Sequence, residues 1–435
     1  MPDVIVIGAG ITGLSCAWKL QTLGVDTLVL ESSKRVGGVI RTERVNGYLV
    51  EWGPSSLQST AETFRLLDEA GLSSDLLESD PRAPIYVYAN GSLRKIPFGP
   101  LSLGGLLRMF GEPFIRSKST KDESVSAFFR RRVGNEAHDR LVVPFVTGIY
   151  AGDTQNLSMA ATFPRFVALE REHGSLVIGM LRSSRKKTKG KRLDRGSSFA
   201  NGLETLPHRL SQGLNLRLGV SDVRVGCDLD TAWSDGEAQP KAVVITVPAY
   251  RALSILERGM PSLARLLENV EYAPMVVAAT SLPDSAFSQP LRGFGFLVSR
   301  AEKIHLLGAR FSSNLFPGRA PQGRALLTSF VGGAFEPEAF NWPDDRVWDV
   351  VGSELQQILH TSANPEPVAL VRHRHAIPQY RIGHERWVAA LRAELKRSPG
   401  LFITGNYLEG VSVPSCMENG ERTAHDVAEF IRSKP

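Results

Sequence analysis

The stretch VIVIGAGITGLSCAWKL, at residues 4–20, constrains the fold more than any other part of the sequence. An apolar run leads into Gly8, Gly10 and Gly13, and a pattern typical of a helix follows. The elements predicted here are a strand at 3–8, a helix at 11–23 and a second strand at 26–31. A strand–helix–strand start of this kind predicts an α/β fold class with a parallel sheet.

The glycine spacing GxGxxG between this strand and helix is typical of a dinucleotide-binding turn. Gly8 allows the tight turn, Gly10 lets the backbone approach a pyrophosphate, and Gly13 lets the helix and strand pack closely. Glu31 lies 18 positions (31 − 13) after the last glycine, where a carboxylate accepts hydrogen bonds from an adenosine ribose. The residues assigned to this part of the site are Gly8, Ala9, Gly10, Ile11, Thr12, Gly13, Glu31 and Ser32.

Length, charge, cysteine content and apolar runs limit the number of domains, the class of ligand and the location of the protein. A chain of 435 residues predicts two to three domains. The net charge of +6 suits an anionic ligand or membrane surface and does not require nucleic acid. Three cysteines without CxxC spacing argue against a disulfide framework or a metal site and fit a reducing, cytoplasmic compartment. No run reaches the roughly 20 apolar residues of a membrane span, and we expect no signal peptide, so any membrane contact lies on one face.

The middle of the chain has a different pattern. Residues 101–118 are apolar with basic residues interspersed, and they are expected to include an amphipathic helix that contacts a membrane. The next helix is predicted from Val125, Phe128, Phe129 and Val133, which recur on one helical face.

Further along, the pattern changes again. Residues 182–196 are nearly all basic and polar, which fits either a membrane-surface contact or a solvated loop, and the loop is favoured. Strand patterns return at 241–250 and 323–333. The end of the chain predicts a strand at 401–406 and a helix from about Pro414.

Two segments after Glu31 carry a resemblance to a known group. ESSKRVGGVIRTE follows directly, and a glycine pair flanked by arginines can close over the far side of a pyrophosphate. VEWGPSSLQ comes next. Both resemble flavoproteins of the amine oxidase and phytoene desaturase superfamily, which implies FAD as the cofactor and a Gly-Pro turn that approaches the flavin. The residues that this resemblance assigns to FAD are Arg35, Gly37, Gly38, Gly53, Pro54, Ser55 and Ser56.

Within that superfamily, further blocks resemble the oxygen-dependent porphyrinogen oxidases of haem synthesis. They are VVPFVTGIYAGD, FANGLETLPHRL, GFGFLVSR with LLGARFSSNLFPGRAPQGRALLTSFVGG, AIPQYRIGH and GNYLEGVSVPSC, and they occur in the family's order along nearly the whole chain. The last block implies that backbone near the final helix meets the flavin. The residues assigned to cofactor binding in the second half of the chain are Val223, His373, Gly405, Asn406, Val411, Ser412 and Val413.

The same resemblance implies substrate contacts and leaves two positions open. Phe294, Gly295, Phe296 and Leu297 match positions that press on the macrocycle, although each is also a plausible strand-core residue. Some relatives have a basic residue that pairs with a propionate where this chain has Ile85. Arg82 is the substitute that we assign, against the alternative of a solvated surface arginine. His373 stands where the family commonly has Trp, and it either packs against the flavin edge or is an ordinary polar strand residue.

The implied activity is FAD-dependent oxidation of protoporphyrinogen IX by dioxygen, with release of hydrogen peroxide. Coproporphyrinogen III is the alternative substrate, and the number of cations lining the pocket would discriminate between them. A flavin amine oxidase fits less well because TGN stands where those enzymes usually have AGE. A non-catalytic flavoprotein is the third alternative. No catalytic side chain is assigned, because the flavin itself accepts the hydride.

The implied partners are the porphyrinogen, dioxygen, a membrane surface contacted peripherally on its cytoplasmic face, the next enzyme of haem synthesis and a second copy of the chain, with no nucleic acid and no metal. The implied fold is a Rossmann-like FAD-binding domain, a mixed-sheet substrate domain and an inserted helical membrane-contact domain. We expect the FAD-binding domain at 1–84, 199–280 and 391–435, the substrate domain with its helical insertion at 85–198, and the remaining substrate domain at 281–390.

Overall fold

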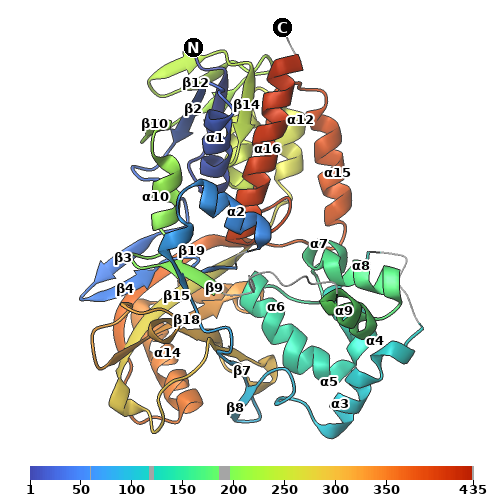
Figure 1. Cartoon of the computed structure of the whole chain (residues 1–435), viewed down its shortest axis with the longest axis vertical. Coiled ribbons are helices and arrows are strands. Elements are labelled where there is room, and N and C mark those ends of the chain that lie inside the picture. The colour runs from blue at the N-terminus through green and yellow to red at the C-terminus, as the bar shows by residue number, and fades with distance from the viewer. Residues whose placement is uncertain (59, 117–121, 186–195, 434–435) are drawn as a thin grey trace.

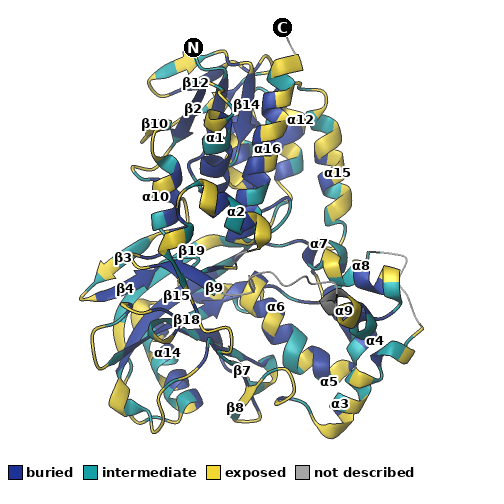
Figure 2. Cartoon of the chain, in the orientation of Figure 1, coloured by how far each residue is buried: buried dark blue, intermediate teal, exposed yellow. Residues whose placement is uncertain are grey.

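A computed structural model describes residues 1–58, 60–116, 122–185 and 196–433. The chain forms an upper part that carries both termini, a sheet below it, and a group of helices beside that sheet (Figure 1). The buried residues gather in the strands and on the inner faces of the helices (Figure 2). Among the described helices, none is both long and apolar enough to cross a bilayer.

The upper part is built on a five-stranded parallel sheet. Its strands, in spatial order, are β10 (Asn215–Leu218), β2 (Thr27–Glu31), β1 (Val4–Ile7), β14 (Ala242–Ile245) and β20 (Leu401–Ile403). All four residues of β1 and of β14 are buried, because helices cover both faces of a parallel sheet. One face packs on α1 (Ile11–Thr22), α2 (Ala61–Glu69), α10 (Thr205–Ser211) and α16 (Val413–Ser433). The other packs on α11 (Ala249–Leu256), α12 (Pro261–Leu267) and α15 (His384–Leu395).

The predicted strand–helix–strand start is confirmed, and so is the last helix. The prediction of a strand across 241–250 is wrong in its second half. β14 ends at Ile245, and Pro248 begins the turn into α11. Proline has no N–H to donate to a sheet ladder and suits the start of a helix, so the apolar run divides there.

The lower sheet has seven strands. In spatial order they are β19 (Glu366–Pro378), β15 (Tyr272–Pro283), β18 (Arg324–Gly332), β17 (Leu306–Phe311), β16 (Gly295–Val298), β7 (Ile85–Ala89) and β8 (Ser92–Lys95). The pairing is antiparallel except between β16 and β7. One face packs on α14 (Asp344–Leu359). Along the chain, α13 (Ser312–Leu315) follows β17 and precedes β18. β18 confirms the strand predicted at 323–333.

Three small sheets complete the strands. They are β3 (Thr42–Val45) with β4 (Tyr48–Glu51), then β5 (Leu57–Gln58) with β9 (Gly196–Phe199) and β6 (Leu76–Glu78), then β11 (Arg224–Val225) with β12 (Thr231–Trp233) and β13 (Gly236–Ala238). The expected domain boundaries stay a prediction, although β15 begins at Tyr272, before the boundary expected at 280.

The helical part lies between β8 and β9 along the chain. Its helices are α3 (Leu103–Phe110), α4 (Val125–Val133), α5 (Asn135–Ala137), α6 (Val143–Tyr150), α7 (Met159–Thr162), α8 (Pro164–His173) and α9 (Leu176–Arg185). The predicted face of α4 is confirmed, since Val125, Phe128 and Phe129 are buried together in one cluster, with Val133 packed against it. Most of the basic segment predicted at 182–196 lies outside the described residues.

Candidate functional site

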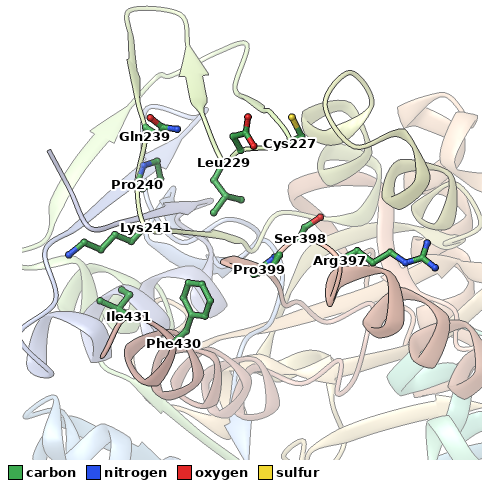
Figure 3. Close-up of a pocket in the computed structure, with 11 residues that line it drawn as sticks. Cys227, Leu229, Gln239, Pro240, Lys241, Arg397, Ser398, Pro399, Phe430 and Ile431 are labelled. Atoms are coloured by element: carbon green, nitrogen blue, oxygen red, sulfur yellow. The ribbon is translucent and has the colours of Figure 1, made fainter. Parts of the chain in front are cut away.

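Two cavities are candidates for the functional site. One of about 560 Å³ lies at the outer end of the upper part, beside Leu229, Lys241 and Arg397 (Figure 3). Its two cations extend away from each other in that view. Lys241 pairs with Asp3 at 2.9 Å, and Arg397 pairs with Glu394 at 2.9 Å. Because neither cation converges on this cavity, we place the functional site at the second cavity and the glycine turn beside it.

The glycine turn has the shape that a dinucleotide needs. Gly8 has a φ of +107°, which favours glycine. A Cβ on Gly13 would lie 2.0 Å from the Gly8 carbonyl oxygen, so only glycine lets α1 approach the strand so closely. A Cβ on Gly10 would meet no atom within 4 Å. The protein therefore leaves open space at the N-terminus of α1, where a pyrophosphate is bound by backbone N–H groups and the helix dipole.

Glu31 closes the other side of this turn. Its carboxylate accepts hydrogen bonds from the Ala9 N–H at 2.7 Å and the Ser33 N–H at 2.8 Å. Each carboxylate oxygen can accept a further bond, so ribose hydroxyls remain compatible with this arrangement. Val223 lies beyond Val220, whose N–H donates to the Glu31 carbonyl at 2.9 Å. Val220 thus lies at the end of β2, three positions before Val223.

The arginine beside the glycine pair makes its contacts within its own loop. The Arg35 guanidinium donates to the carbonyls of Val36 at 3.0 Å and Ile40 at 3.1 Å, and also to the Gly38 carbonyl. It therefore fixes the loop, and its assignment to FAD stays a prediction. The loop itself is held against that turn, because the Gly37 N–H donates to the Ala9 carbonyl at 2.8 Å.

Two further segments extend the cofactor site toward the lower sheet. Gly53 and Pro54 on one side, and Asn406 and Val411 on the other, all line the second cavity. Gly53 must be small, because a Cβ there would lie 2.3 Å from the Val39 carbonyl oxygen.

Serines lie beside both segments. The Ser55 hydroxyl is buried and has no hydrogen-bond partner among the described residues, which fits a polar ligand group in contact with it. The Ser412 hydroxyl accepts the Ser415 N–H at 3.2 Å, and α16 begins at Val413. Gly405 is buried in the turn that precedes this helix. The residues present therefore fit FAD, from the glycine turn to the cavity.

The second cavity has a volume of about 400 Å³ and lies between the lower sheet and α6. Gly295 and Leu297 line it from β16, and Phe294 lines it just before that strand. Phe296 also borders the cavity, but it is only 2% exposed and packs in the core formed with α14. Successive residues of a strand point to opposite faces, so the Phe296 side chain lies on the far side of the sheet.

His373 lies in the cavity wall, next to the predicted flavin turn. Its Nε2 is 2.7 Å from the Trp52 carbonyl oxygen, so Nε2 carries the proton and donates it there. This bond joins β19 to the residue that precedes Gly53. Arg82, in contrast, is exposed in the turn before β7 and is not among the residues that line the cavity.

The sequence reasoning assigned no role to the arginine of this cavity. Arg310, on β17, lines the cavity, and its guanidinium carbon lies 5.3 Å from the centre of the Phe294 ring. Burial lowers the pKa of Arg310 to about 10, and the negative charge of Glu51 opposes this shift. The side chain is therefore a cation at neutral pH. A block that resembles the family's substrate-domain strands contains Arg310, but only the register of β16 with β17 places its side chain in the cavity.

The described residues contain no cluster of three or more metal-ligating side chains. Within the cavity itself, polar groups are few and the walls are mainly apolar. Such a site can bind a large, mostly apolar ligand, exclude water and orient the ligand through a small number of polar contacts.

Comparisons with known proteins agree with this geometry. Residues 11–428 match the family described as flavin containing amine oxidoreductase. The chain is 34% identical to protoporphyrinogen oxidase 1 from Spinacia oleracea chloroplasts, over 99% of this chain and 84% of that protein. It is 29% identical to coproporphyrinogen III oxidase from Bacillus subtilis, over 99% and 98% of the two chains.

Solved structures show the same fold. A protein from Exiguobacterium sp. 255-15 superimposes with a TM-score of 0.82 at 24% identity, over 98% of both chains. UDP-galactopyranose mutase superimposes with a TM-score of 0.77 at 16% identity, over 99% of this chain and 96% of that one. The predicted resemblance, the α/β fold and FAD as cofactor are confirmed. The protein is an oxidoreductase that belongs to the flavin-containing amine oxidoreductase family.

Proposed function

We propose that the protein oxidises protoporphyrinogen IX to protoporphyrin IX with FAD as the immediate acceptor. The observation that carries this proposal is the position of the apolar cavity. The cavity is bordered by the lower sheet, by α6 and by the two turns assigned to the flavin. The names of two full-length relatives, one a protoporphyrinogen oxidase and one a coproporphyrinogen III oxidase, support the substrate class.

In this chemistry the side chains have to exclude water and to bind and orient the substrate. Bound FAD supplies the hydride acceptor. The apolar walls exclude water and restrict how the macrocycle can lie beside the turns assigned to the flavin. His373 donates a hydrogen bond from Nε2–H to the Trp52 carbonyl, so Nδ1 is the ring atom that remains to bond a ligand.

The number of cations supports protoporphyrinogen over coproporphyrinogen. The two substrates differ by two carboxylates on the ring. Among the described residues that line the cavity, Arg310 is the one arginine or lysine. Burying additional carboxylates without cationic partners is costly, so a cavity with one such anchor suits the less charged substrate. Coproporphyrinogen III remains the second candidate because of the Bacillus subtilis relative.

Dioxygen as the final acceptor, with hydrogen peroxide as product, completes the proposal and rests on the resemblance in sequence. The test is a paired aerobic assay of the purified holoprotein. Each porphyrinogen is offered separately, and porphyrin fluorescence and peroxide are followed together. Faster oxidation of protoporphyrinogen with three peroxides per porphyrin supports the proposal. Faster oxidation of coproporphyrinogen identifies coproporphyrinogen III as the substrate. If neither porphyrinogen is oxidised, the proposed function is rejected, but the assignments of the fold and of FAD are unaffected.

A membrane surface is the proposed location of this reaction. Four apolar side chains of α3 and the turn after it are exposed, namely Leu103, Leu107, Phe110 and Phe114, and we call them the α3 patch. Phe110 stacks on Phe98, which is also exposed. Clustered apolar exposure of this kind is typical of a helix that lies in the interface of a bilayer. The proposed face is the cytoplasmic one.

A further inference from the structure

Arg310 is a cation in a mainly apolar cavity. Buried charges in proteins are normally paired with an opposite charge or hydrogen-bonded. Within the described part of the chain, no hydrogen bond or ion pair joins the Arg310 guanidinium to an acceptor. The Phe294 ring, 5.3 Å away, offers it a cation–π contact that leaves its N–H groups without acceptors.

Glu51 is the acid whose charge acts on Arg310, but it makes its contacts elsewhere. Its carboxylate accepts the Leu203 N–H at 2.9 Å and the Thr42 hydroxyl at 2.7 Å. It also lies 3.9 Å from Nη2 of Arg319. Glu51 therefore helps to keep Arg310 charged without satisfying its donors. The planar guanidinium is free to bind an acid that enters the cavity.

The strand register explains how this side chain has room. Gly295 pairs with Arg310 on one side and with Ile85 on the other. Residues directly opposite one another share a face of the sheet. A Cβ on Gly295 would lie 2.8 Å from the Arg310 Cα, so glycine is required between the two strands. The missing side chain leaves the surface between Arg310 and Ile85 open to a ligand.

We propose that Arg310 binds a carboxylate arm of the substrate and makes the cavity selective for the acid over a neutral macrocycle. A guanidinium can hold a carboxylate through two parallel N–H···O bonds, which fixes the orientation of the ring as well as its position. The cation that the sequence suggests at Arg82 is thereby supplied from β17 instead. This inference rests on the proposed function, because a porphyrinogen is the ligand that brings the carboxylate.

The test compares an acid and its neutral ester on the holoprotein. Protoporphyrin IX and its dimethyl ester are titrated in the same detergent buffer, and binding is followed by porphyrin fluorescence. Wild type is expected to bind the acid about tenfold or more tightly than the ester. Arg310→Met should lose about 10- to 100-fold in affinity for the acid and little for the ester, and Arg310→Lys should recover part of the loss.

Arg94→Met is the matched control, since Arg94 is an exposed arginine on β8 of the same sheet. It should bind the acid as wild type does. An equal preference of wild type for acid and ester overturns the proposal even if the Met variant fails to fold, and so does an unchanged preference in a folded, FAD-loaded Arg310→Met. Because binding is measured without turnover, these outcomes are separate from the porphyrinogen assay. If wild type oxidises protoporphyrinogen but binds acid and ester equally, the proposed function is kept and the proposed role of Arg310 is rejected.

Discussion

Two glycines of one motif have separable roles at the residue scale. Gly13 lies against the Gly8 carbonyl, whereas the space beside Gly10 is empty of protein atoms. A methyl group added at Gly13 therefore collides with the fold, and one added at Gly10 collides only with a bound ligand. The two positions distinguish a requirement for folding from a requirement for FAD.

Gly10→Ala should lower FAD affinity about tenfold or more while the apoprotein keeps its melting temperature. Gly13→Ala should instead cost about 1–3 kcal/mol of unfolding free energy, because the overlap lies between backbone atoms. Flavin absorbance after gel filtration and thermal unfolding of the apoprotein measure the two effects. Gly352→Ala is the control, since that Cβ also meets nothing within 4 Å but lies in α14. Full FAD retention in Gly10→Ala would reject the motif assignment.

Residues with a local signature could be predicted from the sequence, and those defined by long-range packing could not. The glycine turn and Glu31 are defined by spacing along a short segment, so their placement was predictable. Arg310 enters the cavity through pairing with Gly295, 15 positions (310 − 295) earlier, and the family-like block around it does not single it out. The Phe296 side chain lies in the core because of the strand's alternation, which the family resemblance alone does not reveal.

At the scale of elements, α3 is hydrogen-bonded to α4 on one side and exposed on the other. Arg108 donates to the carbonyls of Arg132 at 3.0 Å and Arg131 at 2.8 Å, which ties α3 to α4. Leu103 and Leu107 are 74% and 67% exposed on the same helix. Figure 2 shows this helix largely exposed at the lower end of the molecule, far from the upper sheet. The sequence predicted an amphipathic helix here, and the structure supplies its orientation.

Leu107→Glu should weaken binding to vesicles of phosphatidylcholine and phosphatidylglycerol about tenfold or more, because it removes an apolar contact and introduces a charge into the interface. Vesicle co-sedimentation measures the change. Leu218→Glu on β10 is the control, an exposed leucine (45%) on the upper sheet outside the α3 patch, and it should bind as wild type does. Equal losses in both variants would show that the α3 patch is not the contact.

A buried ion pair holds the same group of helices together. The Glu112 and Arg132 side chains are fully buried and form an ion pair. Glu112 also accepts the Leu176 N–H at 2.9 Å and the Val177 N–H at 3.2 Å, so it caps the start of α9. The two partners lie 20 positions (132 − 112) apart, and their pairing depends on how α4 packs against the turn after α3, where Arg132 also donates to the Ile115 carbonyl at 2.9 Å. Sequence patterns predict such helices but not this contact.

Glu112→Gln should destabilise the protein by about 3 kcal/mol, because it removes the nearer of the two carboxylates beside the buried Arg132 guanidinium and leaves only Glu170, at 3.5 Å. Urea unfolding of the FAD-loaded protein measures the loss. The control is Glu394→Gln, which breaks the pair with the exposed Arg397 and should cost about 1 kcal/mol or less. A loss in Glu112→Gln no larger than in this control would contradict the structural role of the pair.

On the scale of the whole molecule, the cavity belongs to no single part of the chain. Gly53 comes from the first part, α6 from the helical part, β16 and β17 from the lower sheet, and Asn406 from the last turn. The order of these elements was largely predictable, because each has its own hydrophobic pattern. The cavity was not, because its shape depends on how far α6 lies from β16.

Gly148 sets that distance. It lies on α6 in the cavity wall, and a Cβ there would come within 2.6 Å of a methyl group of Leu297 on β16. Because the contact is with the end of a flexible side chain, Gly148→Ala should push Leu297 into the cavity rather than unfold the protein. The expected result is a KM for protoporphyrinogen raised about tenfold, with FAD content and melting temperature unchanged or slightly higher. Gly104→Ala on α3 is the control, since the nearest atom to its Cβ is the Ser102 hydroxyl at 3.8 Å. Steady-state kinetics measure the KM of both variants. An unchanged KM in Gly148→Ala would mean that the macrocycle does not contact the α6 wall of the cavity.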